Sequence, residues 1–393
     1  MLQAAARYFR REPSIVFHVV TVDHGLRAVS ADEAAAVGAV ARSFGLSHSV
    51  RRWVGAAPAG NLQGRARRAR YALLVEAARA IGAAAVMTAH HQDDQIETHF
   101  LAAARHAGDR GLAGMRAERA LAPGVVLLRP FLAIPGAALK ASLCGRPVVD
   151  DPSNHDPRFD RVRLRLALAA GGLDRQAVLA AIVRHASARD AADRRIADSL
   201  QRLQDNRQIV IRPLGTAEVD RQALAGLAPA TGIDLLGRIL AAVGGGDYPP
   251  QHAATERLWA RLGQNNVSSP VAATLGGVCV SGGETLLFAR EFGREGPASL
   301  PLSAGLPAVF DGRFDLEPTS PDEPGAVLVP CGALGRGNAI EKTLPVALDA
   351  AGRPVAAPAC LHAKLGPGLR ALALRERVSW RLSADLPSTP ASK

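Results

Sequence analysis

The first 165 residues alternate between strand-like and helix-like patterns of apolar and polar positions. The run "SIVFHVVTVDHG" at 14–25 is β-branched and apolar and ends in turn residues, which is typical of a buried parallel strand. An alanine-rich helix follows, with a capping-box pattern at Ser30 and Glu33 and a stop at Gly45. Further strands are predicted at 48–54 and 83–89, and further helices at 61–82 and 92–105. This order predicts an α/β fold: a Rossmann-like parallel sheet with crossover helices.

From about residue 165 the pattern changes to helical stretches, and beyond about residue 301 to short strand-like pieces rich in Pro and Gly. Residues 173–203 indicate a helical hairpin, and residues 274–291 a β-hairpin around a glycine turn. We therefore expect an α/β domain at 1–168, a helical region ending in a β-hairpin at 169–300, and a small, mainly β module with a loose tail at 301–393.

The chain is strongly basic, with a formal net charge of +11. Only four of its 47 basic residues are lysine, at positions 140, 342, 364 and 393, so the other 43 are arginine. An excess of this size favours a polyanionic partner such as nucleic acid, although a coding bias toward arginine and alanine would produce the same balance.

Cysteine usage and hydropathy exclude several other classes of protein. No CxxC pair is present, which argues against a zinc site, an iron–sulfur site or a disulfide framework. No run approaches the roughly 18 apolar residues of a membrane span, and nothing resembles a signal peptide, so we expect a cytoplasmic protein. The four cysteines are Cys144, Cys279, Cys331 and Cys360.

Titratable side chains are concentrated in "AHHQDDQIET" (89–98), directly after a predicted strand. If a helix starts near Gln92, Asp94 and Glu97 share one face and His90 lies in the preceding turn. Ligands collect at the carboxyl ends of parallel strands, so these three groups could hold a metal bound to phosphates or pair with an ammonium group. Asp94 is the candidate metal ligand. Asp93, in contrast, is interpreted as an acid that suits the helix dipole.

Three other segments carry candidate binding residues. "VDHGLR" (22–27) closes an earlier strand with Asp23 and His24, which would form a neighbouring wall of the same pocket unless this is an ordinary turn. Arginine suits phosphates because it offers planar, bidentate donors, and it recurs in the other two segments. These are Arg67 and Arg70 beside Tyr71, and Arg161, Arg163 and Arg165 at the end of "DDPSNHDPRFDRVRLR" (150–165).

Taken in order, these pieces resemble the tRNA(Ile)-lysidine synthetase family of the N-type ATP pyrophosphatase superfamily. The likeness is dense to about residue 165 and patchy afterwards, where "TLGGVCV" and "LPVALDAAGRPVAAP" look like pieces of the family's C-terminal region. The matching segments are "VDHGLR", "ARRARY" (66–71), "TAHHQDDQIET" (88–98), "GLAGM" (111–115), "LRPFL" (128–132) and "DDPSNHDPRFDRVRLR".

The resemblance implies an ATP-dependent ligase that acts in two steps. ATP adenylates the wobble cytidine of isoleucine tRNA with a CAU anticodon, and the ε-amine of free L-lysine then displaces AMP. It further implies Mg²⁺ as a cofactor, a tRNA-binding role for residues 169–300, and a homodimer. By motif position, Arg70 would contact the phosphates or the adenylate, with Asp23, His24 and Arg67 also at the nucleotide. The remaining roles implied are lysine or magnesium handling by His90, Asp94 and Glu97, and nucleotide or tRNA contact by Arg161, Arg163 and Arg165.

The sequence also departs from the family pattern. The superfamily's phosphate loop, Ser-Gly-Gly-x-Asp-Ser, is absent from the 21 residues ahead of Val22, and "SGGET" (281–285) is interpreted as a turn. We expect that the natural protein starts upstream, and that the chain as given lacks a central strand, exposes apolar edges and has little activity. His106 and Val162 stand where the family has glycine and asparagine.

Two alternatives stay open. The chain could be a catalytically impaired tRNA-binding protein that has lost its ATP loop, or a related tRNA-thiolating ATP pyrophosphatase. The absence of a CxxC pair argues against the cluster-binding thiolating enzymes. The reading frame ahead of Met1 would separate the ligase from the binding protein.

Overall fold

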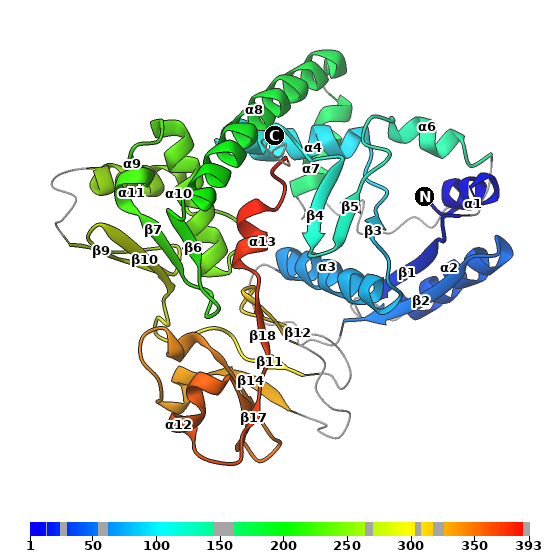
Figure 1. Ribbon diagram of the computed structural model, residues 1–393. Helices are drawn as coiled ribbons and strands as arrows, with labels where there is room; N and C mark the ends of the chain where they lie inside the picture. Colours follow the sequence, from blue (N-terminus) through cyan, green and yellow to red (C-terminus); the bar gives the residue numbers. More distant parts are fainter. Residues whose placement is uncertain are drawn as a thin grey trace. The chain divides into compact units, whose positions relative to one another are not determined.

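The computed structural model describes residues 1–12, 14–23, 30–53, 62–144, 160–170, 172–263, 270–302, 308–316 and 326–387. The chain divides into two compact units, Met1–Asp190 and Ala191–Lys393 (Figure 1). The boundaries expected near residues 168 and 300 stay predictions.

The first unit is an α/β structure, as the alternating pattern predicted. Strands β1 and β2 pair in parallel, with His18 opposite Ser47 and Asp23 opposite Arg52. Strands β3 and β5 also pair in parallel, and β4 runs antiparallel to β5. The elements in chain order are α1 (Leu2–Arg11), β1 (His18–Asp23), α2 (Ser30–Ser43), β2 (Ser47–Arg52), α3 (Leu62–Ala80), β3 (Ala85–Met87), α4 (Gln92–Ala103), α5 (Asp109–Leu112), β4 (Glu118–Ala122), β5 (Val125–Leu128), α6 (Gly136–Ala141) and α7 (Asp160–Ala170).

The described strands of this unit form two sheets, β1-β2 and β3-β5-β4. Helix α3 contacts strands of both sheets, so one helix covers parts of each (Figure 1). Glycines with positive φ follow α2 and α3, Gly45 at 76° and Gly82 at 66°, which confirms the predicted stops. Within the described residues, β1 pairs with β2 alone and β3 with β5 alone, so β1 and β3 each have one edge without a pairing strand.

His106, in the turn after α4, adopts the left-handed conformation with φ of 52°. Side chains with a Cβ are disfavoured there, whereas glycine adopts it freely, which explains why a glycine suits this place in "RHAG". We expect His106→Gly to raise the free energy of unfolding of the first unit by about 0.5–1 kcal/mol. Urea unfolding measures this, with Arg105→Gly at the preceding, exposed position as the control. Equal destabilisation by both substitutions would contradict the prediction.

The second unit has two hydrophobic cores. The first lies between α10 and a five-stranded sheet of order β6-β7-β10-β9-β8, where Leu235, Leu236 and Phe288 are fully buried. The second lies among the short strands after residue 300 and includes Phe310 and Phe314. The elements are β6 (Ile209–Ile211), β7 (Ala217–Asp220), α9 (Arg221–Ala225), α10 (Pro229–Gly244), α11 (His252–Gly263), β8 (Val271–Leu275), β9 (Val278–Gly282), β10 (Thr285–Arg290), β11 (Leu300–Pro301), β12 (Ala308–Phe310), β13 (Phe314–Leu316), β14 (Val327–Pro330), β15 (Pro345–Leu348), β16 (Pro354–Ala357), α12 (His362–Leu365), β17 (Arg370–Ala371), β18 (Leu374–Glu376) and α13 (Val378–Ser383).

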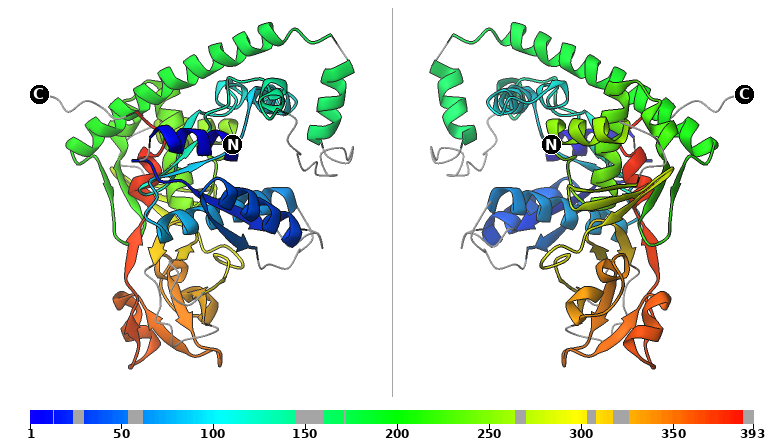
Figure 2. Two further views of the ribbon diagram at one scale, coloured as in Figure 1. Left: turned by 90° about the vertical axis from the view of Figure 1, so that its right-hand side faces the viewer. Right: turned by 90° about the vertical axis from the view of Figure 1, so that its left-hand side faces the viewer.

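One expected element differs from the structure. The helical hairpin expected at 173–203 is instead a single helix, α8 (Arg175–Asp205), of 31 residues (Figure 2). No Gly or Pro interrupts this stretch, so nothing in it breaks the helix. The hairpin expected at 274–291 is confirmed by the antiparallel pairing of β9 with β10, and "SGGET" spans the turn between them. No helix in the described part of the chain is long and apolar enough to cross a membrane.

Candidate functional site

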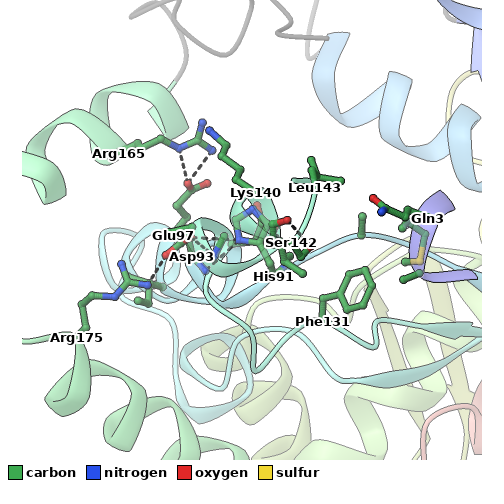
Figure 3. A pocket seen from close by; sticks show the side chains of 18 of the residues that line it. Gln3, His91, Asp93, Glu97, Phe131, Lys140, Ser142, Leu143, Arg165 and Arg175 are labelled. Atoms are coloured by element: carbon green, nitrogen blue, oxygen red, sulfur yellow. Dashed lines mark hydrogen bonds and ion pairs between the residues drawn. The ribbon is translucent and has the colours of Figure 1, made fainter. Parts of the chain in front are cut away.

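A cleft of about 1810 Å³ opens in the first unit at the start of α4. Helices α1, α4, α6 and α7 and the first residue of α8 supply its lining (Figure 3). Charged side chains of both signs face it. The acids are Asp93, Asp94 and Glu97, and the bases are Arg7, Arg10, Arg11, Lys140, Arg165 and Arg175.

Helix α4 begins at Gln92, as predicted, and its N-cap is His91. The backbone N–H of His91 donates to Asp94 Oδ2 over 2.9 Å, and the Asp93 N–H donates to His91 Nδ1 over 3.3 Å. This reciprocal capping box fixes Asp94 in the first turn, beside the cleft. His90 lies one residue earlier, and its Nδ1 is 2.8 Å from Thr88 Oγ1.

Glu97 lies one turn beyond Asp94 and is only 3% exposed. Its Oε1 accepts a hydrogen bond from Nε of Arg165 on α7 over 2.8 Å and forms an ion pair with Nη2 of the same side chain, also at 2.8 Å. The hydrogen bond to Glu97, together with the charge of that carboxylate, raises the pKa of Arg165 against the effect of burial. The other carboxylate oxygen, Oε2, is buried and has no hydrogen-bond partner among the described residues. A buried acceptor of this kind is costly unless a donor satisfies it, so Glu97 is suited to a cationic ligand in the cleft.

Asp93 on α4 forms hydrogen bonds to both α6 and α8. Its Oδ2 accepts the Gly136 N–H at the start of α6 over 2.9 Å, and its Oδ1 accepts a hydrogen bond from Arg175 on α8 (Figure 3). Burial acts to raise the pKa of Asp93, but Arg175, the Gly136 N–H and His91 together hold that pKa below its usual value. Asp93 therefore does more than suit the helix dipole: it holds α6 and α8 to α4.

Arg175→Met should make the first unit less stable in a pH-dependent way. Because Asp93 and Arg175 are 32% and 47% exposed, we expect a loss of only about 0.5–1 kcal/mol at pH 7. The pKa of Asp93 is lowered on folding, so the stabilisation is present above the unfolded value of about 3.9 and disappears as the pH falls through the folded value. Urea unfolding from pH 7 down to about pH 2.5 should show the free energies of unfolding of wild type and Arg175→Met becoming equal in acid. The prediction is contradicted if the difference in free energy of unfolding between wild type and Arg175→Met is constant with pH. It is also contradicted if Arg184→Met, at an exposed position on the same helix, shows an equal difference.

Of the residues singled out from sequence, the structure brings Asp94, Glu97 and Arg165 to the cleft, and His90 lies next to Ala89 and His91, which line it. Asp23 is buried at the end of β1, where its Oδ2 is 3.4 Å from Nε of Arg52. Arg67 and Arg70 lie on the exposed side of α3, and Arg163 is exposed on α7. Among the described residues that line the cleft, none is Asp23, Arg67, Arg70 or Arg163. His24 and the side chain of Arg161 lie outside the described residues.

Sequence reasoning missed two cleft residues that only the fold brings near Asp93 and Glu97. Arg175 stands 82 residues after Asp93 in the sequence, and Lys140 lies on α6, which was not anticipated. Val162, at the family's asparagine position, is buried and also lines the cleft. At this position the protein therefore presents an apolar side chain where the family has a polar one. No group of three or more His, Cys, Asp or Glu side chains is placed to hold a metal within the described part of the chain.

Comparison with known proteins defines the class first. Residues 1–171, which include the cleft acids, match the model of the PP-loop domain. Three relatives carry the same name, tRNA(Ile)-lysidine synthase. That of Rhodopseudomonas palustris is 40% identical over 300 residues, covering 72% of this chain and 83% of the relative. The Ruegeria pomeroyi protein is 36% identical over 325 residues, covering 80% of this chain and 73% of the relative. The Methylobacterium nodulans protein is 42% identical over 254 residues, covering 63% of this chain and 73% of the relative.

The chain belongs to the tRNA(Ile)-lysidine synthase family. The resemblance identified from sequence motifs is thereby confirmed, together with the fold class.

Proposed function

We propose that this protein is a tRNA(Ile)-lysidine synthase. It ligates free L-lysine to the wobble cytidine of isoleucine tRNA bearing the CAU anticodon, and it consumes ATP through an adenylated tRNA intermediate. The observation that carries the proposal is the buried Glu97, whose Oε2 lacks a partner among the described residues, in the cleft of a PP-loop domain. An ε-ammonium group is a fitting partner for that oxygen, since it is cationic and has three donors.

In this mechanism the acids of α4 handle the lysine. Glu97 Oε2 accepts one N–H of the ε-ammonium group, and Asp94, one helical turn away, accepts another and takes up the proton that must leave before the amine can attack. The nitrogen lone pair then forms the bond to the cytidine ring, and AMP departs with the bonding electrons. The position of both acids on one helix, fixed by the His91 cap, keeps the amine in one orientation.

Phosphate groups suit the basic side of the cleft. Arg7, Arg10 and Arg11 on α1 face it and offer donors for the charge that develops as pyrophosphate and AMP leave. Magnesium would enter with the phosphates of ATP and would offset their charge. Asp94 stays our proposed protein ligand to it, and would hold it through Oδ1 in the adenylation step, because Oδ2 accepts the His91 N–H. The same Oδ1 serves the amine only in the second step, after pyrophosphate has left. We place the reaction in the cytoplasm and propose a homodimer, with residues 169–300 contacting tRNA.

The test is the incorporation of labelled lysine into a CAU isoleucine tRNA transcript, with and without ATP. The same transcript with a UAU anticodon is the control. The protein of residues 1–393 is compared with a version extended upstream through any phosphate loop encoded there. ATP-dependent labelling of the CAU transcript alone supports the proposal. Tight tRNA binding with no labelling by either version would replace it with the alternative of a catalytically inactive RNA-binding protein.

A further inference from the structure

A second group of basic residues lies outside the cleft, around Tyr71 on α3. Arg67 Nη2 donates to the Tyr71 hydroxyl over 3.4 Å, and the Arg67 guanidinium lies 5.2 Å from the centre of the Tyr71 ring. Arg129, which follows β5, also shares a hydrogen bond with the Tyr71 side chain, and Arg119 of β4 is close enough to repel Arg129. Two guanidinium groups therefore contact Tyr71, and a third, that of Arg119, lies close to one of them.

The most buried member of this group is Arg129, which is 3% exposed. Its Nη1 donates to the Arg116 carbonyl over 2.7 Å, but its Nε and that of Arg119 are buried without a hydrogen-bond partner among the described residues. Burial lowers the pKa of Arg129, and the side chains that act on this pKa are Tyr71, Arg119 and Arg67, none of them a carboxylate. A buried cation normally has an acid beside it, so this positive charge calls for an anion.

The position of the group in the fold indicates which anion. Arg129 comes directly after the carboxyl end of β5, the edge at which parallel α/β sheets bind ligands. Arg70, our candidate for the adenylate, precedes Tyr71 on α3. Arg67 is exposed while Arg129 is buried, so the group reaches from the surface inward. Forked guanidinium donors match the oxygen atoms of a phosphate bidentately.

We propose that Arg67, Arg119 and Arg129, arranged around Tyr71, form a phosphate subsite beside the carboxyl end of β5. The inference deepens the proposed function and rests on it for the source of the phosphate, which is either the tRNA backbone or ATP. Tyr71 positions Arg67 and Arg129, and the unpartnered Nε groups of Arg119 and Arg129 are the donors that an incoming phosphate satisfies.

The experiment measures binding rather than turnover. The affinity of the full chain for the CAU isoleucine tRNA transcript is measured between 50 and 200 mM salt, and its affinity for ATP is measured separately. Arg67→Gln and Arg119→Gln are compared with wild type, and Arg105→Gln is the control for loss of one exposed positive charge. Arg129→Lys tests the buried position with its charge kept, and circular dichroism verifies that each variant is folded.

A tRNA phosphate in the subsite predicts that the slope of log affinity against log salt falls by about 0.7–0.9 in each Gln variant, with ATP affinity unchanged. A phosphate of ATP predicts about tenfold weaker ATP binding with the tRNA slope unchanged. The subsite is overturned if the Gln variants match Arg105→Gln in both measurements, or if wild type binds neither ligand. Wild type that binds but incorporates no lysine refutes the proposed function alone, since the binding measurements still decide on the subsite.

Discussion

Lysine incorporation is expected to fall by about 100- to 1,000-fold when Glu97 is replaced by glutamine, with the fold retained. The substitution keeps the shape of the side chain but removes the charge that would hold the ε-ammonium group. It also replaces one acceptor oxygen by a donor, and a donor would repel that group. Asp94→Asn should have a comparable effect, since its amide oxygen can still cap α4 but cannot take up a proton.

Glu118→Gln is the matched control, because Glu118 is exposed on β4 and does not line the cleft. The measurement is the initial rate of labelling of the CAU transcript at saturating ATP and at several lysine concentrations. A rise in the KM for lysine without loss of kcat would assign Glu97 to binding alone, whereas loss of kcat would assign it to proton transfer as well. Full activity in both Glu97→Gln and Asp94→Asn would refute the assigned roles.

The largest loss of stability is expected from Phe288→Ala in β10. This side chain is fully buried in the first core of the second unit, so its removal leaves a cavity and should lower the free energy of unfolding by about 3–5 kcal/mol. Tyr248→Ala is the control, since that ring is 79% exposed and should matter by less than about 0.5 kcal/mol.

Urea unfolding followed by tryptophan fluorescence and circular dichroism measures both variants. Because the two units have separate cores, we expect the transition of the second unit to move to lower urea while that of the first unit stays in place. If Phe288→Ala shifts both transitions equally, the units unfold as one and the prediction is wrong.

Local sequence patterns predicted the elements that local physics determines. The start of α4 at Gln92 and the stops at Gly45 and Gly82 were all readable, because caps and positive-φ glycines act within a few residues. The separation into two sheets was not, since strand pairing depends on residues far apart in sequence. The prediction of a helical hairpin in place of α8 was wrong because a long helix and a helical hairpin share the same periodicity of apolar positions.

The candidate site was predictable to the same extent. Asp94 and Glu97 could be placed on one face because three-residue spacing fixes neighbours in a helix. The partners of these acids could not be predicted. Arg175 comes from α8, and Arg165 turned out to pair with Glu97, because tertiary contacts select which of many arginines meets which acid. With 43 arginines in the chain, composition alone cannot make that choice.

The place of Lys140 in the cleft makes the protein well suited to amine spectroscopy. The whole chain holds four lysines, so reductive methylation with ¹³C-formaldehyde labels four side chains and the terminal amine. The resulting NMR spectrum contains few resonances, and two of them, from Lys140 and from the terminal amine of Met1, come from residues that line the cleft. Titration with ATP, tRNA or free lysine can then be followed at these two resonances, without mutation and without turnover.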